Sequence, residues 1–141
     1  MDYKRRLRHV RLALDEARLD ALLITHLANI RYLCGFSGSS GVFVVDKRQP
    51  ILFTDGRYTE QALEEVRVAK VKIANKSVLM FAAEWLAARS LTHAIGIEAA
   101  HLTVAERDVL LKILRRRAKL RNAPPRSRNS ISAPAECCTI A

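Results

Sequence analysis

The apolar positions along this chain repeat first with a helical period and then as short unbroken runs. Leu7, Val10 and Leu14 recur at spacings of three and four among basic residues, so they predict an amphipathic helix over residues 2–18. The run over residues 21–25, Ala-Leu-Leu-Ile-Thr, is apolar until its last residue, as a strand buried on both faces requires. The chain is therefore expected to open with a helix that packs on a sheet.

Segments with a helical period and short apolar runs continue to alternate through residue 114. The remaining predicted elements are a short helix over 28–33, hairpin strands at 42–45 and 51–54, a helix over 57–66, a strand over 68–74, a helix over 77–89, a strand over 94–98 and a helix that begins at 103. Helices and strands alternate, with one hairpin inserted. This order predicts an α/β fold of three layers, in which a mixed sheet carries helices on both faces.

The last two helices carry sequence signals for their first turns. Ser77 is predicted to be an N-cap, and Thr103 with Glu106 has the pattern of a capping box. The positions expected to face the core in these helices are Leu79, Met80, Ala83, Leu86, Ala87, Val104, Leu110, Leu111 and Leu114.

The length and composition are those of one globular domain. The 141 residues are 50% hydrophobic and 27% charged, so neither wholesale disorder nor a membrane protein is expected. From residue 122 onward, prolines and serines replace the periodic pattern. We expect a domain over residues 1–121 and an irregular tail or linker over 122–141.

The formal charge of +10 is concentrated near the ends of the chain. Residues 19–111 hold ten Lys and Arg against ten acids, whereas residues 112–141 hold eight against one. The basic C-terminal segment could neutralise phosphates, but it lacks interleaved aromatic residues that would stack on bases. A solvated helix end with a loose tail is the preferred interpretation, and nucleic-acid binding is kept only as the alternative.

Neither cysteines nor histidines are spaced as a disulfide framework or as metal ligands. The residues concerned are Cys34, Cys137, Cys138, His9, His26, His93 and His101. No apolar run reaches the roughly 18 residues of a membrane span, and the basic start is followed by a charged helix in place of a signal peptide's apolar core. We expect a cytoplasmic protein with no membrane segment and no metal or cofactor in this chain.

A glycine-rich loop over residues 35–41, Gly-Phe-Ser-Gly-Ser-Ser-Gly, invites a chemical interpretation. It lacks the Gly-x-Ser-x-Gly pattern of a nucleophile elbow, and Lys47 comes too late for a phosphate-binding P-loop. The 14 acids are scattered, so no carboxylate cluster is expected to hold catalytic metals. We predict that this chain alone has no catalytic residues. The loop either permits tight turns beside the hairpin or forms part of a substrate channel.

Polar residues after two predicted strands form the candidate site. Open α/β sheets place ligand sites beyond the carboxyl ends of their strands, so side chains from both segments are expected to cluster. The candidates for contact with a substrate or a partner domain are Asn29, Arg31, Tyr32, Phe36, Asp55, Arg57 and Tyr58. A structural role competes at Asp55, because an Asp between a strand and a Gly often caps a helix, and Arg57 or Arg31 could pair with it.

Taken in order, these motifs resemble the N-terminal domain of the creatinase and prolidase family, particularly the Xaa-Pro aminopeptidases and dipeptidases. The resemblance spans residues 3–117. It rests on Asp20-Ala-Leu-Leu-Ile, Asn29-Ile-Arg-Tyr-Leu, Gly35-Phe-Ser-Gly-Ser, Thr54-Asp-Gly-Arg-Tyr and Gln61-Ala. Residues 128–136 resemble only weakly the linker that usually follows this domain in family members.

The resemblance implies a ribonuclease H-like arrangement, normally fused to a catalytic domain of the pita-bread type. In that family the catalytic domain binds two divalent metals, usually manganese or cobalt, through two Asp, one His and two Glu. Those ligands would lie beyond this chain. The N-terminal domain commonly helps to build a homodimer and borders the entrance to the active-site cleft.

Two hypotheses follow from the sequence. The first is a non-catalytic N-terminal domain of an Xaa-Pro peptidase, which contributes to a homodimer and to the substrate entrance. A fragment, a truncated reading frame and a stand-alone homologue all agree with it. The second is a stand-alone anion or nucleic-acid binding module that uses the basic C-terminal segment.

Overall fold

The computed structural model describes residues 2–89, 94–114 and 118–123. Its elements in chain order are α1 (Tyr3–Ala17), β1 (Ala21–Ile24), α2 (Leu27–Cys34), β2 (Val42–Asp46), β3 (Ile51–Asp55), the 3₁₀ turn η1 (Gly56–Tyr58), α3 (Thr59–Glu65), β4 (Lys70–Ala74), α4 (Val78–Ala87), β5 (Ala94–Ile97), α5 (Val104–Leu114) and β6 (Lys119–Asn122). Every helix and strand expected from the sequence is present, with ends shifted by a few residues.

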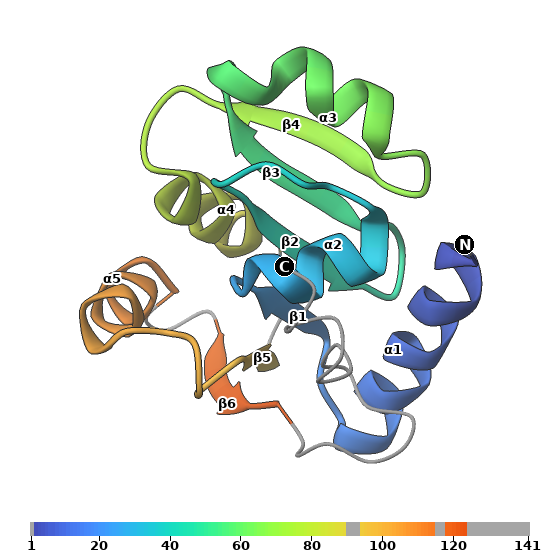
Figure 1. The fold of residues 1–141 in the computed structure, drawn as a ribbon. Helices are drawn as coiled ribbons and strands as arrows, with labels where there is room; N and C mark the ends of the chain where they lie inside the picture. The colour runs from blue at the N-terminus through green and yellow to red at the C-terminus, as the bar shows by residue number, and fades with distance from the viewer. Residues whose placement is uncertain (1, 90–93, 115–117, 124–141) are drawn as a thin grey trace.

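The strands of the described residues form one mixed sheet in the order β4-β3-β2-β1-β5-β6 (Figure 1). The hairpin strand β2 runs antiparallel to both β1 and β3, and the other neighbouring pairs are parallel. The strands β1, β3, β4, β5 and β6 consequently end at one edge of the sheet, and β2 begins there. We call this the carboxyl edge.

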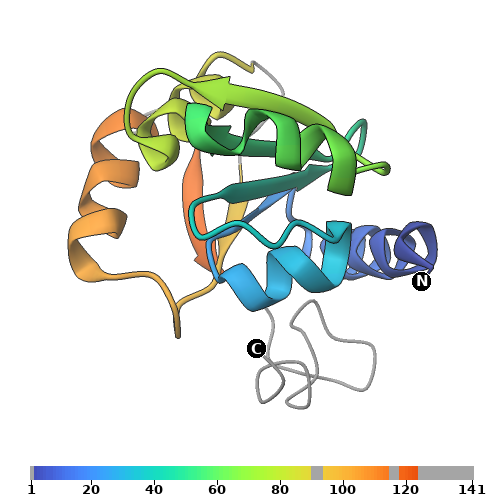
Figure 2. The ribbon, with the colours of Figure 1, turned by 45° about the horizontal axis from the view of Figure 1, so that its top comes forward.

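Helices cover both faces of the sheet, which confirms the predicted layers. On one face, Leu14 of α1 and Ile30 of α2 are fully buried in the same cluster as Phe43. On the other face, Leu86 of α4 packs in a cluster with Phe53 and with Leu110 of α5. Figures 1 and 2 show α1 and α5 on opposite sides of the sheet. Successive residues of a strand point to opposite faces, so the unbroken apolar run of β1 serves both clusters.

Three positions predicted to face the core lie outside it. Met80, Val104 and Leu111 are 38%, 77% and 43% exposed. Met80 and Leu111 lie beside the buried stripes that contain Leu86 and Leu110, whereas Val104 is the first residue of α5. Helical spacing correctly located the buried face of each helix, but it predicted that face to be wider than it is.

The first turns of α4 and α5 differ in their capping. Thr103 Oγ1 accepts from the Glu106 backbone N–H at 3.1 Å, and Glu106 accepts from the Thr103 N–H at 2.8 Å, which confirms the capping box. Ser77 occupies the predicted N-cap position of α4, but its side chain makes no capping hydrogen bond. The prediction for Ser77 was therefore right in position and wrong in chemistry.

The last strand, β6, was not predicted from the sequence. Of its four residues only Leu120 is apolar, and only Leu120 is partly buried. Its pairing with β5 and a hydrogen bond from Ala123 N to Ile97 O at 2.8 Å define it. The tail expected over residues 122–141 lies almost wholly outside the described residues. Among the residues that the structure describes, no helix is both long enough and apolar enough to span a membrane.

Candidate functional site

An open depression of about 460 Å³ lies at the carboxyl edge of the sheet. It is bordered by residues that follow β1, by the last residue of β3, by the loop before β2 and by the first turns of α4 and α5. Its polar lining includes Ser39, Ser40, Asp55 and Lys76. This position agrees with the rule that open α/β sheets offer their sites beyond the carboxyl ends of the strands.

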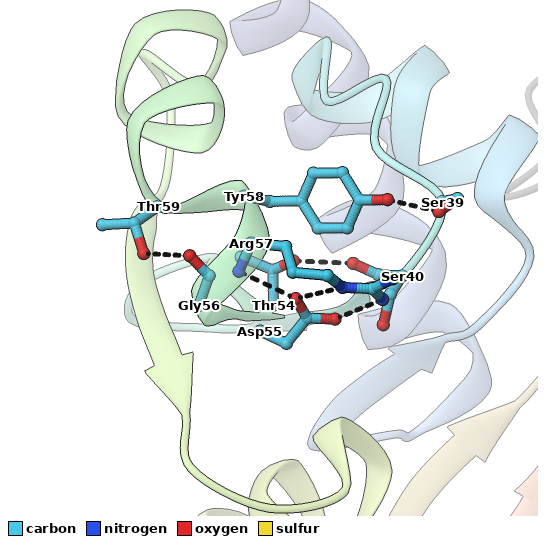
Figure 3. A network of polar contacts seen from close by, with 8 residues as sticks. All are labelled: Ser39, Ser40, Thr54, Asp55, Gly56, Arg57, Tyr58 and Thr59. Atoms are coloured by element: carbon cyan, nitrogen blue, oxygen red, sulfur yellow. Dashed lines mark hydrogen bonds and ion pairs between the residues drawn. The ribbon is translucent and has the colours of Figure 1, made fainter.

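Asp55 and Arg57 form a bidentate ion pair on the rim of this depression (Figure 3). The Arg57 Nε and Nη2 atoms donate to the two carboxylate oxygens at 3.0 and 2.9 Å. The same carboxylate accepts from the Arg57 backbone N–H at 3.0 Å and so caps the turn η1. The Arg57 hydrogen bonds lower the pKa of Asp55 to about 2, and Asp55 in turn raises the pKa of Arg57. The structural role that competed at Asp55 is thus confirmed, and the group is ionised at neutral pH.

The glycine-rich loop is attached to this turn by polar contacts. Thr54 Oγ1 donates to the Ser40 carbonyl at 2.6 Å, and the Ser39 and Tyr58 hydroxyls are hydrogen-bonded to each other (Figure 3). The bond with Ser39 lowers the pKa of Tyr58. The Tyr58 ring meets the Phe36 ring edge-on, with centroids 5.8 Å apart. The loop and the strand end therefore form one connected surface.

Phe36 explains two of the glycines in this loop. Its ring is 1% exposed, and the loop folds around it. A Cβ at Gly38 would lie 2.9 Å from Phe36 Cε1 and closer still to Cζ, and one at Gly41 would lie 3.1 Å from Cε1. Gly35 ends α2 with a φ of 83°, which favours glycine. These contacts support the structural interpretation of the loop and make its exposed serines a fixed surface.

Asn29 lies in a second polar cluster, which is centred on Glu98 at the end of β5. The Glu98 carboxylate is 7% exposed and accepts from the backbone N–H groups of Thr25 and His26, both at 2.9 Å. The Asn29 amide also donates to it. The rings of His26 and His101 stack beside this cluster, with centroids 3.6 Å apart. Glu98 thus joins the end of β5 to the start of α2.

The seven candidate residues therefore do not form one site. Phe36, Asp55, Arg57 and Tyr58 lie together, whereas Asn29 belongs to the Glu98 cluster. Between β3 and β5 lie β2 and β1, so the two clusters are separated by three strand spacings, or roughly 14 Å.

Arg31 and Tyr32 occupy a third place, on α2. The Arg6 guanidinium lies 4.0 Å from the Tyr32 ring centroid and donates to its carbonyl at 2.6 Å, which ties Tyr32 to α1. Arg31 is exposed, and its charge helps to lower the pKa of Glu65. Burial alone would raise that pKa, but hydrogen bonds from Ser37 reverse the direction. Arg31 therefore does not pair with Asp55.

Sequence reasoning missed Glu98. It considered the strand over 94–98 but drew no inference from the acidic residue at its end. The rule that selected Asp55, a polar residue at the carboxyl end of a strand, would also have selected Glu98. The set of candidate residues predicted at this edge was thus incomplete, because it lacked Glu98.

The polar groups of the described residues are suited to binding, whereas the thiol of Cys34 is buried. Among residues 2–89, 94–114 and 118–123, no group of three or more His, Cys, Asp or Glu side chains could hold a metal ion. Burial raises the pKa of the Cys34 thiol to about 12, so its sulfur stays protonated and unreactive. The exposed groups at the carboxyl edge can donate and accept hydrogen bonds and can pair with charges.

Comparisons with known proteins agree on one family. The model of the creatinase/prolidase N-terminal domain matches residues 6–128. Among curated proteins, the uncharacterized peptidase YqhT of Bacillus subtilis is 45% identical over 49 residues, which are 35% of this chain and 14% of that protein. The matched segment is thus a small part of that relative's length.

Solved structures agree in fold over most of the chain. The N-terminal domain of the cytoplasmic peptidase PepQ from Mycobacterium tuberculosis is 35% identical, with a TM-score of 0.77 over 84% of this chain and 92% of that chain. A creatinase/prolidase-like N-terminal domain of a putative metallopeptidase from Corynebacterium diphtheriae is 29% identical, with a TM-score of 0.79 over 90% of this chain and 100% of that chain.

A longer relative shows how this fold occurs within a larger protein. The Xaa-Pro dipeptidase from Bacillus anthracis is 22% identical, with a TM-score of 0.77 over 85% of this chain but only 34% of that chain. None of these matches supports the nucleic-acid alternative, and much of the basic segment on which it rests lies outside the described residues. The chain belongs to the creatinase/prolidase N-terminal domain family, and its fold is the one found in the N-terminal domains of peptidases.

Proposed function

We propose that this chain acts as the non-catalytic N-terminal domain of a metal-dependent Xaa-Pro peptidase and contributes to a homodimer and to the substrate entrance. The observation that carries the proposal is the family match over residues 6–128, together with solved N-terminal domains that the chain covers almost completely. By analogy with the cytoplasmic peptidase from Mycobacterium tuberculosis, we also propose cytoplasmic residence.

The rim formed by Asp55, Arg57 and Tyr58, which is supported from below by the buried Phe36 ring, is the part of the surface that suits a substrate entrance. The Arg57 side chain is 71% exposed, whereas the Asp55 side chain is 23% exposed. Asp55 fixes two of the three guanidinium nitrogens and thereby orients the group. An oriented, exposed guanidinium is suited to a peptide carboxylate. Its ion pair with Asp55, the last residue of β3, ties it to the end of a strand.

The homodimer proposal draws support from apolar residues that this domain leaves exposed. Val104 and Leu111, seven residues apart on α5, are 77% and 43% exposed. A helix that presents apolar side chains to solvent is suited to burial against another protein surface. Analytical ultracentrifugation of the 141-residue chain tests this part of the proposal. A Val104→Ser, Leu111→Ser double variant should shift a dimer toward the monomer, and a monomer at all concentrations contradicts dimerisation by this domain.

The catalytic claim is tested by a peptidase assay. The purified chain is incubated with an Xaa-Pro dipeptide and manganese, with and without a chelator. No turnover is expected, because the family's two metals and their ligands are proposed to lie in a separate catalytic domain. Turnover that persists through purification and stops on chelation would refute a non-catalytic role.

The substrate-entrance claim is tested in a protein that also contains the catalytic domain. Arg57→Gln should raise KM for an Xaa-Pro dipeptide and leave kcat within about twofold, because the guanidinium is proposed to bind and not to react. Arg48→Gln is the matched control, since it removes an exposed arginine from the turn between β2 and β3, at the opposite edge of the sheet. Equal KM values for the two variants would remove Arg57 from the substrate path.

A further inference from the structure

A groove at the edge of the sheet opposite the candidate site gathers positive charge. It has a volume of about 520 Å³ and lies between α1, the turn that leads into β3 and the segment that joins α3 to β4. Pro50 of this groove precedes β3 and Asp55 ends β3, so roughly 16 Å of strand separates the two places. Four of its lining residues, Lys4, Leu7, Arg8 and Arg11, lie on α1 toward the end of the chain marked N in Figure 1. We call it the basic groove.

Every charged side chain that lines the basic groove is cationic. Lys4, Arg8 and Arg11 come from one face of α1, at spacings of four and three, and Arg67 comes from the segment before β4. None of the ion pairs found among the described residues includes any of these four cations. Four like charges around one groove repel each other. A complementary anion would relieve this repulsion.

Asp46, whose backbone carbonyl Arg11 contacts, does not supply that anion, because its carboxylate is engaged elsewhere. Asp15, four residues after Arg11 on α1, pairs with Lys47. Arg11 Nε donates to the backbone carbonyl of Asp46 at 3.3 Å. The Asp46 carboxylate itself is 8% exposed and lies 3.0 Å from the Arg89 guanidinium. It also accepts from the backbone N–H groups of Arg48 and Gln49 at 2.8 and 2.6 Å. No acid among the described residues lines the groove to offset its positive charge, which is therefore available to an external partner.

The floor of the basic groove is apolar. Leu7 is 4% exposed, Pro50 is buried and Val68 is partly buried. A hydrogen bond from Lys70 N to the Pro50 carbonyl at 3.1 Å fixes the floor to the start of β4. A cationic rim over an apolar floor favours a ligand that carries both negative charge and apolar surface.

We propose that the basic groove binds an acidic peptide segment of a partner protein, with an apolar side chain on the floor and carboxylates on the arginines. Single-stranded nucleic acid fits less well, because the lining has no aromatic side chain on which bases could stack. The chain's own C-terminal segment is a poor occupant, since residues 112–141 hold eight Lys and Arg against one acid. This proposal does not depend on the peptidase-domain assignment.

The test measures fluorescence anisotropy of a labelled peptide, Glu-Leu-Glu-Glu-Leu-Glu, with the 141-residue chain at low salt. Arg8→Gln with Arg67→Gln should weaken binding roughly tenfold, as expected for the loss of two ion pairs at a partly dry surface. Arg5→Gln with Arg107→Gln is the matched control, because it removes the same charge from exposed positions outside the groove. The control should change the affinity less than about twofold. Both variants keep residues 112–141, so attraction to that segment cancels in the comparison.

Three results support the proposal when they occur together, and any other outcome overturns it. The peptide binds saturably, the groove variant binds it more weakly than the control variant, and an uncharged peptide with Gln in place of Glu does not bind. Equal weakening in the two variants would mean that only net charge matters. Groove-dependent binding of a labelled single-stranded DNA, without groove-dependent binding of the peptide, would identify nucleic acid as the occupant. Thermal melting of both variants checks that each is folded.

Discussion

Replacement of Glu98 by alanine should strongly destabilise the fold, because this one carboxylate satisfies donors from a different part of the chain. It accepts from the backbone N–H groups of Thr25 and His26 and from the Asn29 amide. Thr25 and His26 form the connection from β1 to α2, and His26 is the N-cap residue of that helix. The alanine variant removes the acceptor that these three donors share.

The expected magnitude follows from these three donors. A buried polar group that loses its partner costs about 1–3 kcal/mol. Thr25 and His26 are only partly buried, so water recovers some of the loss. We therefore expect Glu98→Ala to lower the free energy of unfolding by about 3–5 kcal/mol. Glu98→Gln keeps a carbonyl oxygen for the two backbone donors and loses charge assistance, so it should cost only about 1–2 kcal/mol.

Urea unfolding measures these values, with the fluorescence of Trp85 as the probe. Trp85 is the chain's one tryptophan and packs in the other core cluster, with its ring centroid 5.7 Å from that of Phe53. Glu64→Ala, an exposed change on α3, serves as the control and should stay within about 0.5 kcal/mol. A loss below about 1 kcal/mol for Glu98→Ala, or equal losses for the Ala and Gln variants, would refute the reasoning.

Three further predictions concern the loop, the rim and a helix start. Gly38→Ala should lower the free energy of unfolding by about 1–3 kcal/mol, because the added Cβ overlaps the Phe36 ring, whereas Gly56→Ala meets no atom within 4 Å and should be nearly neutral in the same urea titration. Asp55 has a pKa of about 2 in the folded chain, below the value near 4 of a free carboxyl, so its pairing stabilises the fold above pH 4 and is lost as the pH falls toward 2. Asp55→Asn should therefore flatten this part of the acid-unfolding curve, and an unchanged curve would contradict the assigned cause. Thr103→Ala should cost about 1 kcal/mol by removing the cap of α5, as measured by thermal unfolding.

The fold was predictable from sequence wherever burial imposes a period on the chain. The run over β1 is buried at all four positions, and the hairpin strands are buried at nearly all of theirs, so their apolar runs were unambiguous. The edge strand β6 was missed because an edge strand needs few apolar residues, and Leu120 alone gives no period. Its position depends on pairing with β5, which is a tertiary contact that local sequence does not encode.

The capping chemistry of single residues was predictable only where two residues specify it together. The side chains of Thr103 and Glu106 each accept a hydrogen bond from the other residue's backbone N–H, so the pattern and the structure agree. Ser77 had no such partner in the sequence, and its side chain makes no capping bond. Asp55 was correctly considered as a cap because the Gly that follows it starts a turn. A capping box, which two residues specify together, thus predicted the capping hydrogen bonds better than a single favourable N-cap residue did.

The candidate site divides for a topological reason that the sequence did not reveal. Asn29 and Asp55 both lie near strand ends at the carboxyl edge, and a local rule cannot tell how many strands separate them. The order β4-β3-β2-β1-β5 puts the Asp55 rim and the Glu98 cluster three strand spacings apart. The two groups then meet different environments. Glu98 is almost fully buried and fixes backbone donors, whereas Arg57 is mostly exposed and oriented by its partner. Exposure and orientation together are what a ligand needs from a protein surface, so contacts with substrate or with a partner domain are expected at the Asp55 rim and structural coupling at Glu98.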